Sequence, residues 1–152
     1  MSVETRLTEL GISLPAIAKP VASYVNVVRQ GDLLYLSGGL PDLDDSRFRG
    51  KVPTGVTAEV AQEAARSAIL GRLSVIKDEL GSLDKVTRVV SVQGFVNCEG
   101  DFEAIPQVIN GASDLLGEVF GPEIGAHSRT AVGVASLPLG VCVEVALVVA
   151  VA

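Results

Sequence analysis

Two periods of apolar residues alternate along the chain, and they predict which segments form strands and which form helices. Apolar runs rich in β-branched residues are typical of strands, whereas apolar residues three and four positions apart are typical of helices. The strand-like runs are 21–29, 33–37, 85–98, a run that opens at Arg129, and 141–152. The helical segments are 3–10, 57–80 and 106–120. The predicted order after the first short helix is therefore β-β-α-β-α-β-β.

Start and stop signals support these boundaries. Thr57 is placed to cap the long helix, and Gly81 is a natural end for it. Pro106 suits the first turn of the next helix, and Gly121-Pro122 ends it. The last two strands are predicted to be joined directly by the Leu-Pro-Leu-Gly turn at 137–140, which would place them side by side.

The order of strands and helices predicts an α+β fold. Residues 1–152 are expected to form a single domain, in which 1–20 are an N-terminal lead-in. Two long helices can cover only one face of the sheet. The final run, 141–152, is nevertheless apolar at odd and even positions alike, apart from Glu144. A strand that is apolar on both sides needs cover on both sides, so we expect other copies of the chain to supply it. A monomer in light scattering would contradict this expectation.

Composition narrows the classes of function. The chain has 152 residues, 12 basic and 18 acidic, with a net charge of −6. This balance disfavours nucleic acid as a partner, because such binding needs a basic surface to neutralise phosphates. The sequence has neither a signal-peptide pattern at its start nor an apolar run of membrane-spanning length, which predicts a cytoplasmic protein without a membrane partner.

The cysteine and histidine content argues against a metal site. Cys98 and Cys142 lie in apolar strand-like runs, where buried reduced thiols are favoured over a disulfide or a metal pair. His127 is the only histidine, so no second imidazole stands at metal-ligand spacing. We therefore expect no metal site.

Two charged residues in apolar surroundings are the main candidates for chemistry. Arg129 could clamp a carboxylate with two parallel hydrogen bonds, or could form a structural ion pair or a solvated strand end. Glu144, isolated among valines, could act as a base or orient water, or could pair with a neighbouring cation. His127 could act as an acid or base, or could have no role in the chemistry. Ser37 lacks the pattern of a hydrolase nucleophile.

Two motifs carry a resemblance to a known family. Ser-Gly-Gly-Leu-Pro at 37–41 and Ser-Arg-Thr-Ala-Val-Gly-Val-Ala-Ser-Leu-Pro-Leu-Gly-Val-Cys-Val-Glu-Val at 128–145, together with the element order, resemble the RidA family, also called YjgF-like. Its members are reactive-intermediate deaminases and are also known as endoribonuclease L-PSP or translation inhibitor. The resemblance covers residues 20–152. It implies a chorismate-mutase-like fold, a mixed sheet, and a homotrimer with ligand clefts between subunits.

The resemblance also implies roles for particular residues. Arg129 matches the arginine that binds the substrate carboxylate, and Glu144 matches the glutamate that positions water. The implied reaction is hydrolysis of 2-aminoacrylate and related 2-imino acids to 2-oxo acids and ammonia, without a cofactor. The residues that match the family's cleft-lining positions are Tyr24, Ser37, Gly38, Asn110 and Ala131.

The chain departs from the family pattern at several positions, which indicates a divergent subgroup. Ala131 replaces a cysteine that is common two residues after the arginine, and Gly39 replaces a common glutamine. His127 stands where a small or apolar residue is usual, and residues 99–106 lengthen the approach to the second long helix. Two alternatives stay open: a trimer that binds a small carboxylate-bearing metabolite without catalysis, and, less favoured, an endoribonuclease.

Overall fold

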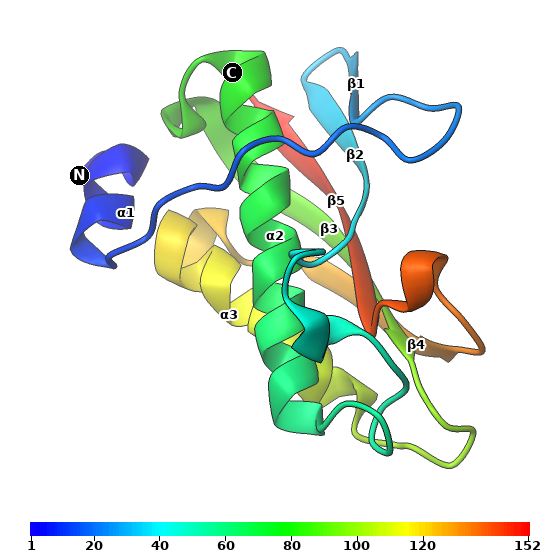
Figure 1. Ribbon diagram of the computed structural model, residues 1–152. Coiled ribbons are helices and arrows are strands. Elements are labelled where there is room, and N and C mark those ends of the chain that lie inside the picture. The colour runs from blue at the N-terminus through cyan, green and yellow to red at the C-terminus, as the bar shows by residue number, and fades with distance from the viewer.

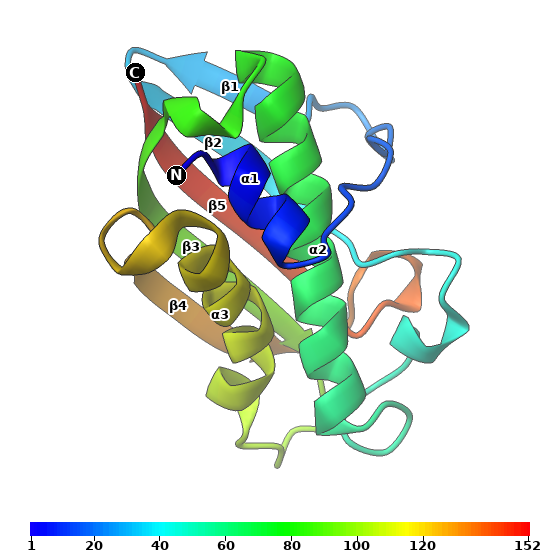
Figure 2. The ribbon, with the colours of Figure 1, turned by 90° about the vertical axis from the view of Figure 1, so that its left-hand side faces the viewer.

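A five-stranded mixed sheet forms the centre of the computed structural model, which describes residues 1–152 (Figures 1 and 2). The strands lie in the order β1-β2-β5-β3-β4. Only β3 and β4 are parallel, and the other neighbours are antiparallel. The strands are β1 (Val27–Gln30), β2 (Leu33–Gly39), β3 (Val86–Asn97), β4 (Ser128–Val134) and β5 (Val143–Val151). This is the expected α+β arrangement with a mixed sheet.

Two long helices cover one face of the sheet (Figure 2). The helices are α1 (Val3–Glu9), α2 (Ala58–Leu80) and α3 (Ile105–Ile124), with short 3-10 turns η1 (Ser46–Phe48), η2 (Leu83–Lys85) and η3 (Pro138–Gly140). Thr57 caps α2 by accepting a hydrogen bond from Val60 N at 3.2 Å, and Gly81 ends it with φ 81°. In α3 the backbone leaves helical geometry at Gly121, as expected, and one further turn follows. No helix has the length and apolar character needed to cross a lipid bilayer.

The core lies between these helices and the sheet. The odd-numbered residues of β5 point to the helices and are buried, whereas the even-numbered residues on the other face are half-buried. Small side chains let α2 and α3 pack closely on the sheet and on each other. The fully buried positions of α2 include Ala61, Ala64, Ala65, Ala68, Ile69, Leu73 and Ile76.

The first strand is shorter than predicted. It begins at Val27 rather than at residue 21, because the Tyr24 N–H donates to Ala22 O and turns the segment before it. The residues just before Val27 still reach β2 through hydrogen bonds from Ser37 N to Asn26 O and from Ser37 Oγ to Val25 O.

The predicted side-by-side pairing of the last two strands is wrong. β3 lies between them, parallel to β4 and antiparallel to β5. β5 is apolar along its length and therefore occupies a central position, with hydrogen bonds on both sides. β4 carries Ser128 and Thr130 and forms the edge of the sheet, where polar side chains reach solvent.

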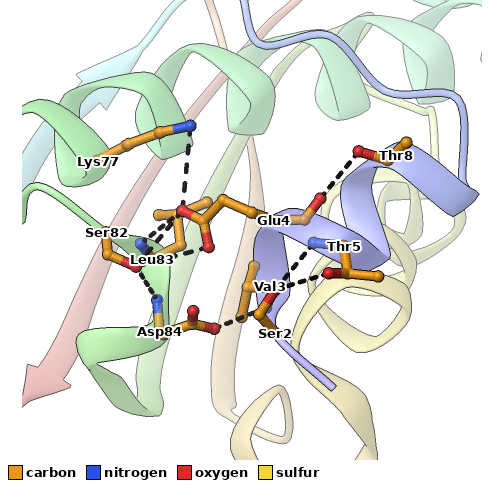
Figure 3. A network of polar contacts seen from close by, with 9 residues as sticks. All are labelled: Ser2, Val3, Glu4, Thr5, Thr8, Lys77, Ser82, Leu83 and Asp84. Carbon is orange, nitrogen blue, oxygen red and sulfur yellow. Dashed lines mark hydrogen bonds and ion pairs between the residues drawn. The ribbon is translucent and has the colours of Figure 1, made fainter.

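The N-terminal helix is held by polar contacts with the corner between α2 and β3 (Figure 3). The Glu4 carboxylate accepts from Leu83 N at 3.2 Å, and Lys77 Nζ lies 4.0 Å from it. Val3 N donates to Asp84 Oδ1 at 2.6 Å. Ser2 caps the helix by accepting from Thr5 N. These bonds position the start of the lead-in that continues across α2.

Candidate functional site

Arg129 lies on edge strand β4 and reaches toward α3. Its Nη1 donates to Asn110 Oδ1 at 2.8 Å and to Ser113 Oγ at 3.2 Å. Its Nη2 makes one long bond, 3.4 Å, to Pro106 O, and its Nε makes none. The guanidinium is therefore held along one side, and its Nε–Nη2 edge is available to a bidentate acceptor such as a carboxylate. No carboxylate lies within ion-pair distance of it in the chain.

His127 supports this arginine through Ser113. His127 Nδ1 is 2.7 Å from Gly125 O, and its Nε2 is 2.9 Å from Ser113 Oγ. A carbonyl oxygen only accepts, so Nδ1 carries a proton and, in the neutral ring, Nε2 accepts from the serine hydroxyl. The hydroxyl oxygen then accepts from Arg129. Both ring nitrogens of His127 therefore have hydrogen-bond partners. His127 orients Ser113, and Ser113 in turn orients Arg129.

Glu144 lies on β5 beside the backbone of Gly38. A Cβ added at Gly38 would fall 2.8 Å from the Glu144 carboxyl carbon, so a larger residue would push the carboxylate out of this position. Glu144 forms no ion pair in the chain. Burial raises the pKa of this carboxyl, and the positive charge of Arg72 offsets part of the rise. A half-buried carboxylate with a raised pKa is suited to accept a proton from water.

Arg129 and Glu144 lie on opposite faces of the sheet. Arg129 pairs with Val92 of β3, which is buried under the helices. Glu144 pairs with Phe95, three residues further along the same strand. Because successive side chains of a strand alternate between faces, positions three apart point in opposite directions. One chain therefore does not bring the two predicted catalytic groups together.

Some of the other predicted residues lie near Arg129, and the others lie near Glu144 or in a cavity beside α2. Asn110 holds Arg129 directly, and Ala131 pairs with Gly94 on the same, helix-covered face as Arg129. Ser37 and Gly38 lie at the end of β2 near Glu144. The Ser37 hydroxyl donates to Val25 O at 2.6 Å and so fastens the lead-in to the sheet. Tyr24 is 43% exposed and lines a cavity of about 520 Å³ between the lead-in and α2.

Two site residues were missed in the sequence, although each carries a signal. Ser113 follows Asn110 by three residues on α3 and so shares its face. Arg72 lies one turn from Ile69 and Ile76 and next to Leu73, so helical spacing puts it on the buried side of α2. A charge at such a position is unusual and marks it for attention.

The two thiols differ in their surroundings. Cys142 is buried, and burial raises its pKa to about 11. Cys98 is half-buried, and burial raises its pKa as well. Neither forms a disulfide, and the predicted burial is found for Cys142 but not for Cys98.

The sheet with both long helices on one face defines the class: an α+β domain with the chorismate-mutase-like fold. The family model described as "YjgF/chorismate_mutase-like, putative endoribonuclease" matches residues 4–151. The chain belongs to this family, which confirms the resemblance read from the two sequence motifs.

Individual proteins agree with this assignment. The chain is 45% identical to Protein TCP17 of Trypanosoma cruzi over 144 residues, which cover 94% of this chain and 90% of that protein. The crystal structure of the protein Atu1372 from Agrobacterium tumefaciens is similar with a TM-score of 0.89 and 39% identity, over 99% of this chain and 92% of the other. A 2-iminobutanoate/2-iminopropanoate deaminase of Dermatophagoides farinae is 29% identical over 138 residues, 91% of this chain and 93% of that protein.

Proposed function

We propose that the protein hydrolyses reactive 2-imino acids and their enamine tautomers, of the 2-aminoacrylate type, to 2-oxo acids and ammonia. The observation that carries this proposal is the state of Glu144: a half-buried carboxylate with a raised pKa and no ion pair, beside glycine backbone. Such a group can hold a water and take its proton. The similarity to the mite deaminase supports the same reaction.

Arg129 supplies the second requirement, a fixed anchor for the substrate carboxylate. Asn110 and Ser113 fix the guanidinium along its Nη1 side, so little side-chain entropy is lost when a carboxylate binds the opposite edge. The anchor determines where the imine carbon lies relative to the water.

The active assembly in this proposal is a homotrimer in which Arg129 of one copy and Glu144 of another share a cleft. The position of the two groups on opposite faces of the sheet supports it, because a site that uses both then needs two copies. So does the apolar open face of the sheet, where Val28 and Tyr35 are 53% and 48% exposed. No cofactor takes part in the proposed reaction.

The chemistry needs only one water molecule. Glu144 accepts a proton from water while the oxygen adds to the C=N carbon of the imine, and the carboxyl returns this proton to nitrogen, which gives a tetrahedral carbinolamine with one OH and one NH2 group. The same carboxyl then accepts the hydroxyl proton and passes it to nitrogen, the C–N bond breaks, and ammonia leaves as the C=O bond forms. Burial raises the pKa of this carboxyl, which favours its use first as base and then as acid.

The first test is ammonia release from 2-aminoacrylate generated in situ, measured for the wild type, Arg129→Ala and Arg66→Ala. Arg66 is a matched control on α2, with a surface ion pair to Glu118. We expect Arg129→Ala to abolish the acceleration and Arg66→Ala to retain it. Equal rates for Arg129→Ala and the wild type would remove the proposal.

Glu144→Gln separates catalysis from simple binding. The amide has the shape of the carboxylate but cannot take a proton, so we expect about a 100-fold or greater loss of rate with 2-oxobutyrate binding retained. Full activity in this variant would contradict the role of Glu144 as the base, whereas 2-oxobutyrate binding without any acceleration of ammonia release by the wild type would favour a non-catalytic, carboxylate-binding protein. The endoribonuclease reading has less support, because the chain is acidic, with a net charge of −6.

A further inference from the structure

A second feature of the chain lies away from Arg129 and borders the Glu144 group through Gly38: the cavity of about 520 Å³ that Tyr24 lines. Its walls come from the lead-in, from the loop after β2 and from the middle of α2, all within one chain. In Figure 1 the lead-in is the blue segment that crosses α2. The volume is in the range of small-molecule sites in proteins.

Arg72 supplies a buried cation to this cavity. The residue is 6% exposed and lines the cavity wall. Its Nη1 donates to Ser37 O at 3.0 Å, and its Nε is buried without any hydrogen-bond partner. No carboxylate lies within ion-pair distance. A buried guanidinium with one hydrogen bond is costly for a folded chain, so an anion that completed its bonds would be strongly favoured.

The backbone next to Arg72 is shaped around its side chain. A Cβ added at Gly39 would fall 2.7 Å from Arg72 Nε. Glycine at this position thus gives the guanidinium its place against the end of β2, where a larger residue would compete with it. The site is therefore built from two elements and does not depend on one flexible surface side chain.

The lining of the cavity indicates the class of ligand. Pro15, Leu40 and Leu70 give it apolar walls. Lys19, Asp42 and Asp44 also line it, and the two carboxylates offset the two cations of the lining, Lys19 and Arg72. A lining whose charges balance, with one buried guanidinium and apolar walls, suits a monoanion with an apolar body, such as a small branched carboxylate, better than a phosphate dianion.

We propose that the cavity between the lead-in and α2 is a binding site for a small apolar carboxylate, complete within one chain, with Arg72 as its anchor. It is separate from the Arg129 group, which lies on β4 at the far edge of the sheet from β1. The proposal does not depend on the deaminase reaction.

Isothermal titration of the full chain with 3-methylbutanoate tests the proposal. We expect the wild type to bind this carboxylate and not the neutral amide 3-methylbutanamide, with inorganic phosphate binding more weakly than the carboxylate. Arg72→Gln should weaken carboxylate binding about 10- to 100-fold, the usual effect of losing a charge-assisted hydrogen-bond pair. Arg129→Ala should bind as the wild type does.

A second variant keeps Arg72 in place and fills the space instead. Gly71 lines the cavity on α2, and a Cβ there meets nothing within 4 Å. Gly71→Leu should block the cavity, and its melting temperature should stay at or above that of the wild type because leucine favours a helix over glycine. We expect it to lose carboxylate binding.

The proposal is overturned by any of four results. These are no binding by the wild type, unchanged binding in Arg72→Gln, unchanged binding in Gly71→Leu, or loss of binding in Arg129→Ala. The last result would assign the carboxylate to the Arg129 group and would leave the proposed deaminase function intact.

Discussion

Gly38 and Gly39 determine how two opposite charges approach the end of β2. Glu144 lies against the first glycine and Arg72 against the second. They do not form an ion pair, yet each affects the other: the guanidinium lowers the pKa of Glu144, and Glu144 raises that of Arg72. For each group, the opposing effect of burial is larger.

The pH dependence of ammonia release should report this coupling. The proposed reaction needs Glu144 as a carboxylate, so activity should fall as pH decreases through its raised pKa, above the ordinary glutamate value of about 4.3. Arg72 lowers that pKa. Arg72→Gln should therefore move the acidic limb of the rate profile to higher pH, measured from initial rates between about pH 4 and 8. An unchanged limb, or a shift to lower pH, would contradict the coupling.

The same pKa shift has a consequence for stability. A carboxyl whose pKa is higher in the folded than in the unfolded chain destabilises the fold when it is ionised, and this cost disappears as pH falls through the folded pKa. Glu144→Gln removes the charge, so the variant should remain folded at neutral pH. A rate loss in that variant then reflects chemistry.

At the scale of elements, the contact between α2 and α3 depends on Gly111. A Cβ added there would fall 2.9 Å from the backbone carbonyl carbon of Gln62 on α2. Because the neighbour is backbone, the helices themselves would have to move apart. The Gln62 side chain also bridges the two helices by donating to Gln107 O at 2.8 Å.

Gly111→Ala should lower the free energy of unfolding by about 1–3 kcal/mol through this overpacking. Gly117 is the matched control on the same helix, since a Cβ there meets nothing within 4 Å. Gly117→Ala should stabilise the chain by about 0.5–1 kcal/mol through helix propensity. Urea denaturation of both variants measures these changes in the free energy of unfolding. Equal changes of the same sign in the two variants would refute the close-contact explanation.

The helices could be predicted from local chemistry, but the neighbours of the last strands could not. Thr57 and Gly81 act through bonds and dihedral angles within a few residues, so the sequence carries that information directly. The place of β5 between β2 and β3 depends on pairing with strands distant in the chain. A short turn at 137–140 favours adjacent strands, and burial of the apolar β5 overrides that local preference.

At the scale of the molecule, one chain leaves a sheet face open. Val28, Tyr35 and Val148 form a row across β1, β2 and β5 on that face. The two-sided apolar pattern of β5 made such a face predictable from sequence. The separation of Arg129 and Glu144 was not predictable, because it follows from the alternation of side chains once β3 is inserted between their strands.

The central claim is that Arg129 of one copy and Glu144 of another form each site, and subunit mixing tests it most directly. Arg129→Ala and Glu144→Gln are each expected to be inactive. Co-expressed in equal amounts, they should form mixed assemblies in which about a quarter of the sites combine an intact arginine with an intact glutamate. Light scattering verifies that the mixture assembles as the wild type does. Recovery of about a quarter of wild-type ammonia release is the predicted result, and a mixture as inactive as its two parents would contradict the account.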